Sequence, residues 1–140
     1  MAAMEITTKI GCSINCRFCP QKVLVSEYFK KADRPEYLSF TTFQTCLDKL
    51  PAEVMIDFAG MCEPWLNPEC TKMVKYAAQR GHKIGIYTTL KGMREEDVEA
   101  LSQIDIYKFV LHVPDADQNS RIEVTKEYLA VLKKLMEKDV

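Results

Sequence analysis

Near its amino terminus the chain reads Met4-Glu-Ile-Thr-Thr-Lys-Ile10, then Gly11, then Cys12-Ser-Ile-Asn-Cys16-Arg-Phe-Cys19. The apolar and β-branched residues of the first part predict a strand, so the cysteines lie on the loop that follows it. Thiolates at this spacing can converge on one face of an iron–sulfur cube, and three of them leave one iron without a protein ligand. Because an open iron can bind a small molecule, the stretch predicts a first strand followed directly by a reactive metal site.

Three further apolar runs have the length of strands: Val54–Ala59, Lys83–Thr88 and Ile106–Val113. The first of them is short and mostly apolar, which is typical of a strand that is buried on both faces. Helical periodicity falls between and after the runs, so the order is strand then helix, repeated along the chain. This order predicts an α/β fold of about four parallel βα units joined by right-handed crossovers.

Segments with apolar residues at helical spacing follow the strands. The first has a capping-box pair, Thr41 with Gln44, and ends before Pro51. The second is expected to be capped by Asn67 and to end at Gly81. The other two expected helices are Arg94–Ser102 and Ile122–Lys138.

Some side chains of these helices are expected in the core. Cys46 and Cys70 fall on apolar stripes, so both are expected to pack inside rather than to bind a metal. The side chains of the last helix that are expected to point inward are Tyr128, Leu129, Leu132, Leu135 and Met136. The long connection Gln21–Ser39 is expected to form a lid or a short extra helix.

Residues suited to ligand binding follow every strand. Gly60-Met-Cys-Glu63 comes after the second strand, Thr88 and Thr89 close the third, and His112 closes the fourth. The carboxyl ends of parallel strands meet at one edge of a sheet. We therefore expect these residues and the cysteine loop to share one site at that edge.

The composition is that of an ordinary globular domain. With 140 residues the chain has the length of one domain, and 47% hydrophobic content, 28% charged content and a formal net charge of −1 predict no nucleic-acid partner. No apolar run approaches the roughly 18 residues that span a bilayer, so no membrane partner is expected. The first residues lack the basic and apolar regions of a signal peptide. The sequence thus predicts a cytoplasmic location.

Six cysteines in a reducing compartment favour metal binding over disulfide formation. One alternative is a secreted domain with three bridges, but the absence of a signal-peptide pattern and the long helical patterns argue against it. A zinc site is another, although structural zinc usually takes four ligands in separated pairs. Simple structural roles also remain open: Cys62 as loop filler, Glu63 as a solvated charge and His112 as a core residue.

The cysteine motif resembles the signature of the radical S-adenosylmethionine (radical SAM) superfamily. Its spacing of three and then two residues, with the aromatic Phe18 before the last cysteine, is that signature. Gly60-Met-Cys-Glu63-Pro-Trp-Leu-Asn-Pro68 resembles the superfamily's glycine-glycine-glutamate motif, although Met61 and Cys62 replace the second glycine and add a residue.

Two shorter stretches add to the resemblance. Tyr87-Thr-Thr89 stands where many members carry Thr-Asn-Gly, without the Asn. Leu111-His112 resembles the strand ending of members with an auxiliary-cluster domain. The variants Asn-Cys-Arg-Phe-Cys-Pro-Gln and Gly-Met-x-Glu-Pro are most similar to uncharacterised members of this SPASM-type group.

The resemblance implies a site for two cofactors, a [4Fe–4S] cluster and S-adenosyl-L-methionine (AdoMet). Cys12, Cys16 and Cys19 would be the metal ligands, and Phe18 would lie near the adenine. The residues implied in holding the methionyl ammonium are Gly60, Met61, Cys62 and Glu63. Those implied in reaching the carboxylate or ribose are Thr88, Thr89 and His112.

The resemblance also implies an activity, that of a radical SAM oxidoreductase. The reduced cluster would cleave AdoMet to a 5′-deoxyadenosyl radical, which abstracts hydrogen from an unknown substrate. An electron donor such as flavodoxin or ferredoxin is implied as a partner. The alternative is a non-catalytic metal-binding interaction module, with zinc or an iron–sulfur cluster, that keeps the fold without the chemistry.

The superfamily's core is a partial (βα)6 barrel, and residues 1–140 match its first four units. The resemblance therefore implies a truncated core domain that lacks the fifth and sixth βα units, in preference to a naturally minimal protein. An isolated chain of this kind would be inactive or weakly active. Its last strand, Ile106–Val113, would be an exposed sheet edge, which favours a homodimer.

Overall fold

The computed structural model describes residues 2–31, 33–138 and 140. Its centre is a parallel sheet in the order β1-β2-β3-β4, with strands β1 (Ala3–Ile6), β2 (Met55–Phe58), β3 (Ile84–Thr88) and β4 (Ile106–Leu111). The predicted α/β fold with parallel βα units is confirmed.

The first strand is shorter than predicted, because the chain leaves the sheet after Ile6. The Thr8 carbonyl then accepts a hydrogen bond from Leu38 at 2.9 Å, and the Ile10 amide donates to Glu36 at 2.8 Å. Lys9 pairs with Tyr37 in an antiparallel bridge. The segment before the cysteines is therefore held by the connection that follows α1, and not by β2.

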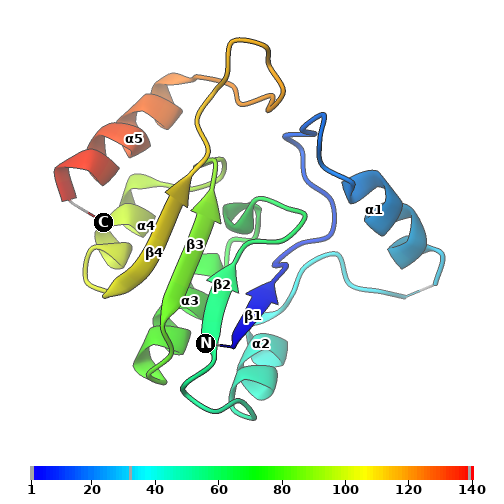
Figure 1. Ribbon diagram of the computed structural model, residues 1–140, viewed down its shortest axis with the longest axis vertical. Coiled ribbons are helices and arrows are strands. Elements are labelled where there is room, and N and C mark those ends of the chain that lie inside the picture. The colour runs from blue at the N-terminus through cyan, green and yellow to red at the C-terminus, as the bar shows by residue number, and fades with distance from the viewer. Residues whose placement is uncertain (1, 32, 139) are drawn as a thin grey trace.

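Within the described residues, five helices accompany the sheet, with one short 3-10 helix, η1 (Pro64–Leu66). They are α1 (Gln21–Phe29), α2 (Phe40–Leu47), α3 (Cys70–Gln79), α4 (Glu95–Leu101) and α5 (Lys126–Lys138). The extra helix expected within the long connection is α1. In Figure 1, α2, α3 and α4 lie behind the sheet, and α5 lies beside α4.

The helix caps differ in part from the predicted ones. Helix α2 is capped by Ser39, whose hydroxyl accepts from the Thr42 amide at 3.1 Å, while Thr41 is already helical. Helix α5 begins at Lys126, later than expected, because the Thr125 hydroxyl accepts from the Tyr128 amide at 3.1 Å.

The inward face of α5 was predicted correctly for Tyr128 and Leu135 but wrongly for Leu129 and Met136. Its buried residues are Tyr128, Val131 and Leu135, whereas Leu129 is 51% exposed and Met136 is 76% exposed. Two overlapping stripes have the same helical spacing, and packing against α4 selects one of them.

The core fills the space between the sheet and the helices behind it. It includes Ile56, Phe58, Ile84 and Ile86, which point from alternate positions of the central strands toward the helices. Cys70 is buried there as predicted, but Cys46 is exposed, so its assignment to the core was wrong.

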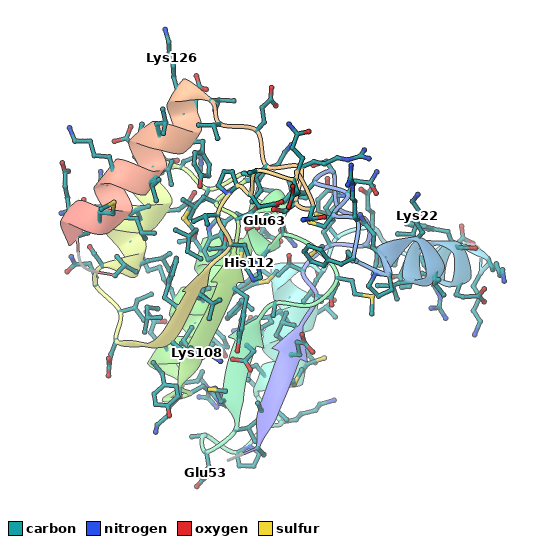
Figure 2. The ribbon with its side chains drawn as sticks, turned by 45° about the horizontal axis from the view of Figure 1, so that its top comes forward. Lys22, Glu53, Glu63, Lys108, His112 and Lys126 are labelled. Atoms are coloured by element: carbon teal, nitrogen blue, oxygen red, sulfur yellow. The ribbon has the colours of Figure 1, made fainter. Side chains whose placement is uncertain are left out.

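The opposite face of the sheet carries different residues. The strand register places Glu5 beside Asp57, Asp57 beside Gly85, and Gly85 beside Lys108. In Figure 2, Glu63 and His112 lie together beyond the carboxyl ends of the strands, and Glu53 lies at the other end. The candidate functional site therefore lies at the carboxyl edge of the sheet.

None of the described helices has the length and apolar content that crossing a membrane requires.

Candidate functional site

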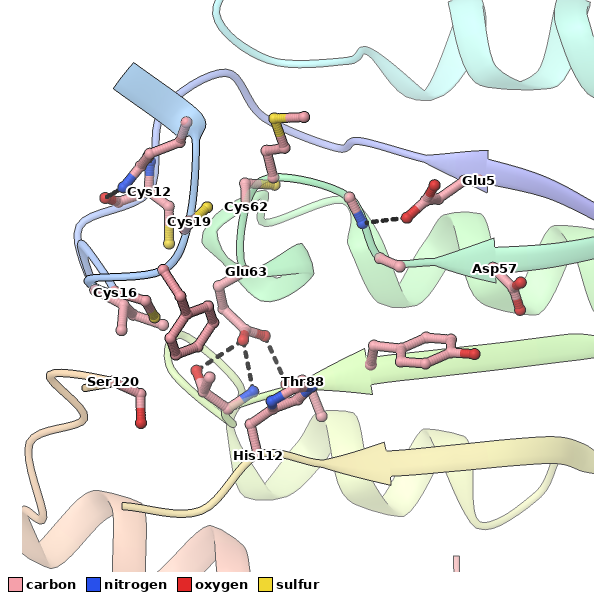
Figure 3. A pocket seen from close by; sticks show the side chains of 18 of the residues that line it. Glu5, Cys12, Cys16, Cys19, Asp57, Cys62, Glu63, Thr88, His112 and Ser120 are labelled. Carbon is pink, nitrogen blue, oxygen red and sulfur yellow. Dashed lines mark hydrogen bonds between the residues drawn. The ribbon is translucent and has the colours of Figure 1, made fainter. Parts of the chain in front are cut away.

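A cavity of about 530 Å³ opens at the carboxyl edge of the sheet (Figure 3). This volume is within the range of small-molecule sites. Every residue that the sequence predicts for the site lines it: Cys12, Cys16, Phe18, Cys19, Gly60, Met61, Cys62, Glu63, Thr88, Thr89 and His112. The expectation that these segments meet at one edge is confirmed, and the role of each residue remains a prediction.

The cysteine loop is fixed at its first cysteine by a side chain from α1. The Cys12 amide donates to Gln21 Oε1 at 2.6 Å, and Gln21 Nε2 donates back to the Cys12 carbonyl at 3.0 Å. Gln21 is buried, and so is Ile14, which anchors the middle of the loop. The turn Cys16–Cys19 is closed by a hydrogen bond from the Cys19 amide to the Cys16 carbonyl at 3.2 Å.

The three thiols of this loop are free and half-buried. Burial raises the pKa of the Cys16 thiol, and the neighbouring Cys12 and Cys19 sulfurs raise it further. Among the described residues, no three His, Cys, Asp or Glu side chains are arranged as a ready metal-binding group.

The donor chemistry nevertheless fits an iron–sulfur cluster. Cys12, Cys16 and Cys19 line one side of a single cavity that is large enough for a ligand, and thiolates are the ligands of such clusters. The other walls carry hydrogen-bonding groups of the kind that binds a polar cofactor.

Glu63 is the centre of a buried hydrogen-bond cluster on the opposite wall. Its Oε1 accepts from the Thr88 hydroxyl at 2.6 Å, and its Oε2 accepts from the Thr89 amide at 2.6 Å and the Thr89 hydroxyl at 2.7 Å. The Thr88 hydroxyl also accepts from the Leu90 amide at 2.9 Å. Figure 3 shows the Glu63 bonds as dashed lines. The cluster joins the ends of β2 and β3.

Burial is the main influence on the pKa of Glu63. It raises the pKa of this carboxyl, while the hydrogen bonds from Thr88 and Thr89 act in the opposite direction. The carboxylate and the two hydroxyls are already paired with one another. A ligand would therefore meet a rigid polar wall here, and not separate flexible side chains.

The loop before Glu63 has a constrained backbone at Gly60. Its φ is +87°, and a Cβ at this position would lie 2.2 Å from Thr7 Oγ1. The Gly60 amide donates to Glu5 Oε1 at 3.2 Å. Glycine is required here for the turn and the close approach.

Met61 and Cys62, the two residues that depart from the superfamily's motif, face different surroundings. Met61 is 38% exposed at the cavity, whereas Cys62 is buried with its sulfur 3.7 Å from the Thr8 hydroxyl. Burial raises the pKa of the Cys62 thiol. Cys62 thus has a packed environment and also contributes to the cavity wall.

Phe18 and His112 lie at the rim of the cavity. Phe18 is 68% exposed, which leaves its ring free to contact a ligand. The His112 backbone amide donates to the Thr88 carbonyl at 2.8 Å, while its side chain is exposed. His112 is therefore not a core residue.

The lining residues that were not predicted from the sequence include Glu5, Asp57, Tyr87 and Ser120. Asp57 Oδ1 is buried with no hydrogen-bond partner among the described residues. A Cβ on Gly85 would lie 1.9 Å from that oxygen, so the glycine makes room for the carboxylate. Burial raises the pKa of Asp57. The sequence feature that could have indicated Asp57 is the presence of an acidic residue in an otherwise apolar strand.

Comparison with known proteins places this site in context. No protein-family model matches the chain. It is similar to the tungsten-containing aldehyde ferredoxin oxidoreductase cofactor-modifying protein of Pyrococcus furiosus, with 28% identity over 123 residues. The match covers 83% of this chain and 32% of that protein, so the chain spans about a third of its relative's length.

Two solved structures share the fold. BtrN in complex with AdoMet and 2-DOIA matches with a TM-score of 0.61 at 20% identity, over 79% of this chain and 44% of that one. Selenomethionine BtrN in an open conformation matches with a TM-score of 0.62 at 20% identity, over 85% and 53% of the two chains. These matches show that the chain shares its α/β fold with BtrN.

Proposed function

We propose that this chain is the cofactor-binding part of a radical SAM enzyme. In this proposal residues 1–140 form the amino-terminal part of the core domain, with a [4Fe–4S] cluster and AdoMet as cofactors. The SPASM-type relationship, an unknown substrate and a cytoplasmic location belong to the same proposal.

One observation supports this proposal most strongly. The thiols of Cys12, Cys16 and Cys19 and the Glu63–Thr88–Thr89 cluster line the same cavity, in a fold shared with a protein that binds AdoMet. Thiolates and a polar wall are the groups that a cluster and an amino-acid moiety require. Their position at the carboxyl edge is where α/β sheets bind ligands.

In this proposal each group of residues has its own role. Cys12, Cys16 and Cys19 would ligate three irons and leave the fourth open to AdoMet. The Gly60–Glu63 loop would accept hydrogen bonds from the methionyl ammonium, and Phe18 would cover the adenine. His112, with an exposed ring at the rim, would approach the carboxylate or the ribose.

When bound, the cluster would supply one electron for cleavage of the C5′–S bond of AdoMet, and hydrogen abstraction from the substrate would follow. The chain's own contribution is to orient AdoMet and to exclude water. Ile14 and the Glu63 cluster, which are buried at the cavity wall, would help to do so. An electron donor such as flavodoxin or ferredoxin would reduce the site.

Anaerobic reconstitution with iron and sulfide tests the proposal. We expect about four irons per chain, broad absorption near 400 nm, and 5′-deoxyadenosine when AdoMet and dithionite are added. A chain that takes up cluster but yields no 5′-deoxyadenosine would lack turnover on its own. Zinc binding without iron uptake would contradict the proposal and favour a metal-binding interaction module.

The open edge of β4 supports a proposal about association. In the described chain β4 pairs only with β3, so its outer backbone groups are free for another strand. We expect a homodimer at tens of micromolar, measured by light scattering. A monomer at that concentration would show that the edge is protected.

A further inference from the structure

Two loops from opposite edges of the sheet meet above the cavity. β1 and β4 are the edge strands, so the loops that follow them begin far apart. Yet the Arg17 amide, in the cysteine loop, donates to the Asn119 carbonyl at 2.8 Å. In Figure 1 the loop after β4, in orange, reaches toward the loop after β1, in blue. The contact bridges the carboxyl ends of β2 and β3.

The loop after β4, residues 115–121, takes its shape from one carboxylate and is called here the Asp115 loop. Asp115 Oδ1 accepts from the Asn119 amide at 2.9 Å and from Asn119 Nδ2 at 3.0 Å. Its Oδ2 accepts from the Ser120 amide and hydroxyl, both at 2.9 Å. These bonds hold the pKa of Asp115 at about 2. The hydrogen bonds of this carboxylate are thus made within its own loop.

The Asp115 loop contacts the cysteine loop at one particular cysteine. Arg17, which bonds to Asn119, directly follows Cys16. Ser120 is buried and lines the cavity together with Cys16. Cys12, by contrast, is held from α1 by Gln21.

We propose that Asp115 is a positioning residue, which holds the Asn119 carbonyl against the Arg17 amide and so fixes Cys16 at the cavity. The contact itself does not depend on the proposed function; its consequence for a cluster does. With a cluster bound, the loop would restrain one of its three ligands.

The direct test measures the alkylation rate of each cysteine in the metal-free 140-residue chain, using iodoacetamide and peptide mass spectrometry. Exposed Cys46 on α2 is the internal reference. Asp115→Ala is expected to raise the rate at Cys16 relative to Cys46 by about threefold or more, because the thiol gains access. The rate at Cys12 is expected to change less.

Two further variants make the result specific. Asp117→Ala removes the same charge from an exposed position in the same loop and is expected to leave Cys16 unchanged. Asp115→Asn keeps one acceptor oxygen and is expected to give an intermediate rate; it also decides the test if the alanine variant does not fold. Equal rates at Cys16 in the Asp115 variants and Asp117→Ala would overturn the proposal.

A second measurement addresses the cluster. In reconstituted protein, Asp115→Ala is expected to lose iron to a chelator faster than Asp117→Ala, since one of the three ligands is less restrained. Equal rates of iron loss would overturn the role of the loop in holding the cluster. If the wild-type chain takes up no cluster, the proposed function fails, and the alkylation rates still decide whether the Asp115 loop holds Cys16.

Discussion

The two walls of the cavity differ in how they are held. Glu63, Thr88 and Thr89 are buried, and their polar atoms bond to one another between the ends of β2 and β3. The three thiols of the cysteine loop are half-buried and lie on an irregular segment. Contacts from outside the loop hold its backbone, through Gln21 at one end and Asn119 at the other.

The Glu63 wall is thus suited to recognising a ligand, and the cysteine loop is suited to ligating a metal. A rigid wall of paired polar groups loses little conformational entropy when a ligand binds, which favours selective binding of one shape. A loop held by a few backbone contacts can adjust its thiols around a metal cluster. We therefore expect substitutions on the two walls to impair different properties of the protein.

The largest expected effect is loss of the cluster. Cys12→Ala, Cys16→Ala or Cys19→Ala should reduce iron from about four per chain to almost none, because a cluster with two protein thiolates is poorly held. Far-UV circular dichroism should be unchanged, since none of these thiols is in the core. Cys46→Ala is the matched control and should retain iron; unchanged iron in Cys16→Ala would refute the ligand assignment.

The rigid wall should be the more sensitive to backbone changes. Gly92, three residues after Thr89, has φ +82°, and a Cβ there would lie 2.4 Å from the Trp65 carbonyl oxygen. Gly92→Ala is expected to lower the free energy of unfolding by about 2–5 kcal/mol through left-handed strain and overpacking. Gly11→Ala, at φ +91° in the cysteine loop with its nearest atoms 3.9 Å away, should cost only the strain, about 1–2 kcal/mol.

Urea denaturation of the two glycine variants measures this contrast. Equal losses would show that the two walls are equally constrained, contrary to the comparison drawn above.

Glu63→Gln tests recognition at the rigid wall. The amide keeps the shape and can still bond to Thr88 and Thr89, but it loses the charge. AdoMet affinity is expected to fall by about 1–3 kcal/mol, the scale of a charge-assisted hydrogen bond. Glu53→Gln, at the far end of the sheet in Figure 2, is the control for charge. Isothermal titration of reconstituted protein should show equal affinity for Glu53→Gln and wild type.

The smallest expected effect concerns pH. Burial raises the pKa of Glu63 in the folded chain, so the folded state holds its proton more tightly than the unfolded state. The corresponding stability is present below the unfolded pKa and is lost as pH rises through the folded pKa. The unfolding free energy of wild type minus that of Glu63→Gln should thus decrease as the pH rises above about 4, the ordinary pKa of glutamate. A constant difference would contradict a raised pKa.

The sequence predicts the sheet and the location of the site well. Short apolar runs identified β2, β3 and β4 to within one or two residues, because buried parallel strands have few other patterns. The rule that parallel strands bring their carboxyl ends together then placed Glu63, Thr88 and His112 at one cavity.

Features that depend on tertiary contacts were not predictable. Ser39 and Thr41 are both good cap residues two positions apart, and only the path of the chain selects Ser39. On α5 the exposed Leu129 has the same periodicity as the buried Tyr128. Likewise, nothing in the local sequence indicates that Asn119 meets Arg17, because the two loops begin at opposite edges of the sheet.

The most direct test of the central claim is the electron paramagnetic resonance spectrum of the reduced, reconstituted chain before and after AdoMet is added. A cluster held by Cys12, Cys16 and Cys19 has one iron without a protein ligand, so AdoMet should bind that iron and change the g-values. We predict a clear change in wild type and a change in Glu63→Gln only at higher AdoMet concentration. A cluster signal that is identical with and without saturating AdoMet would contradict the account.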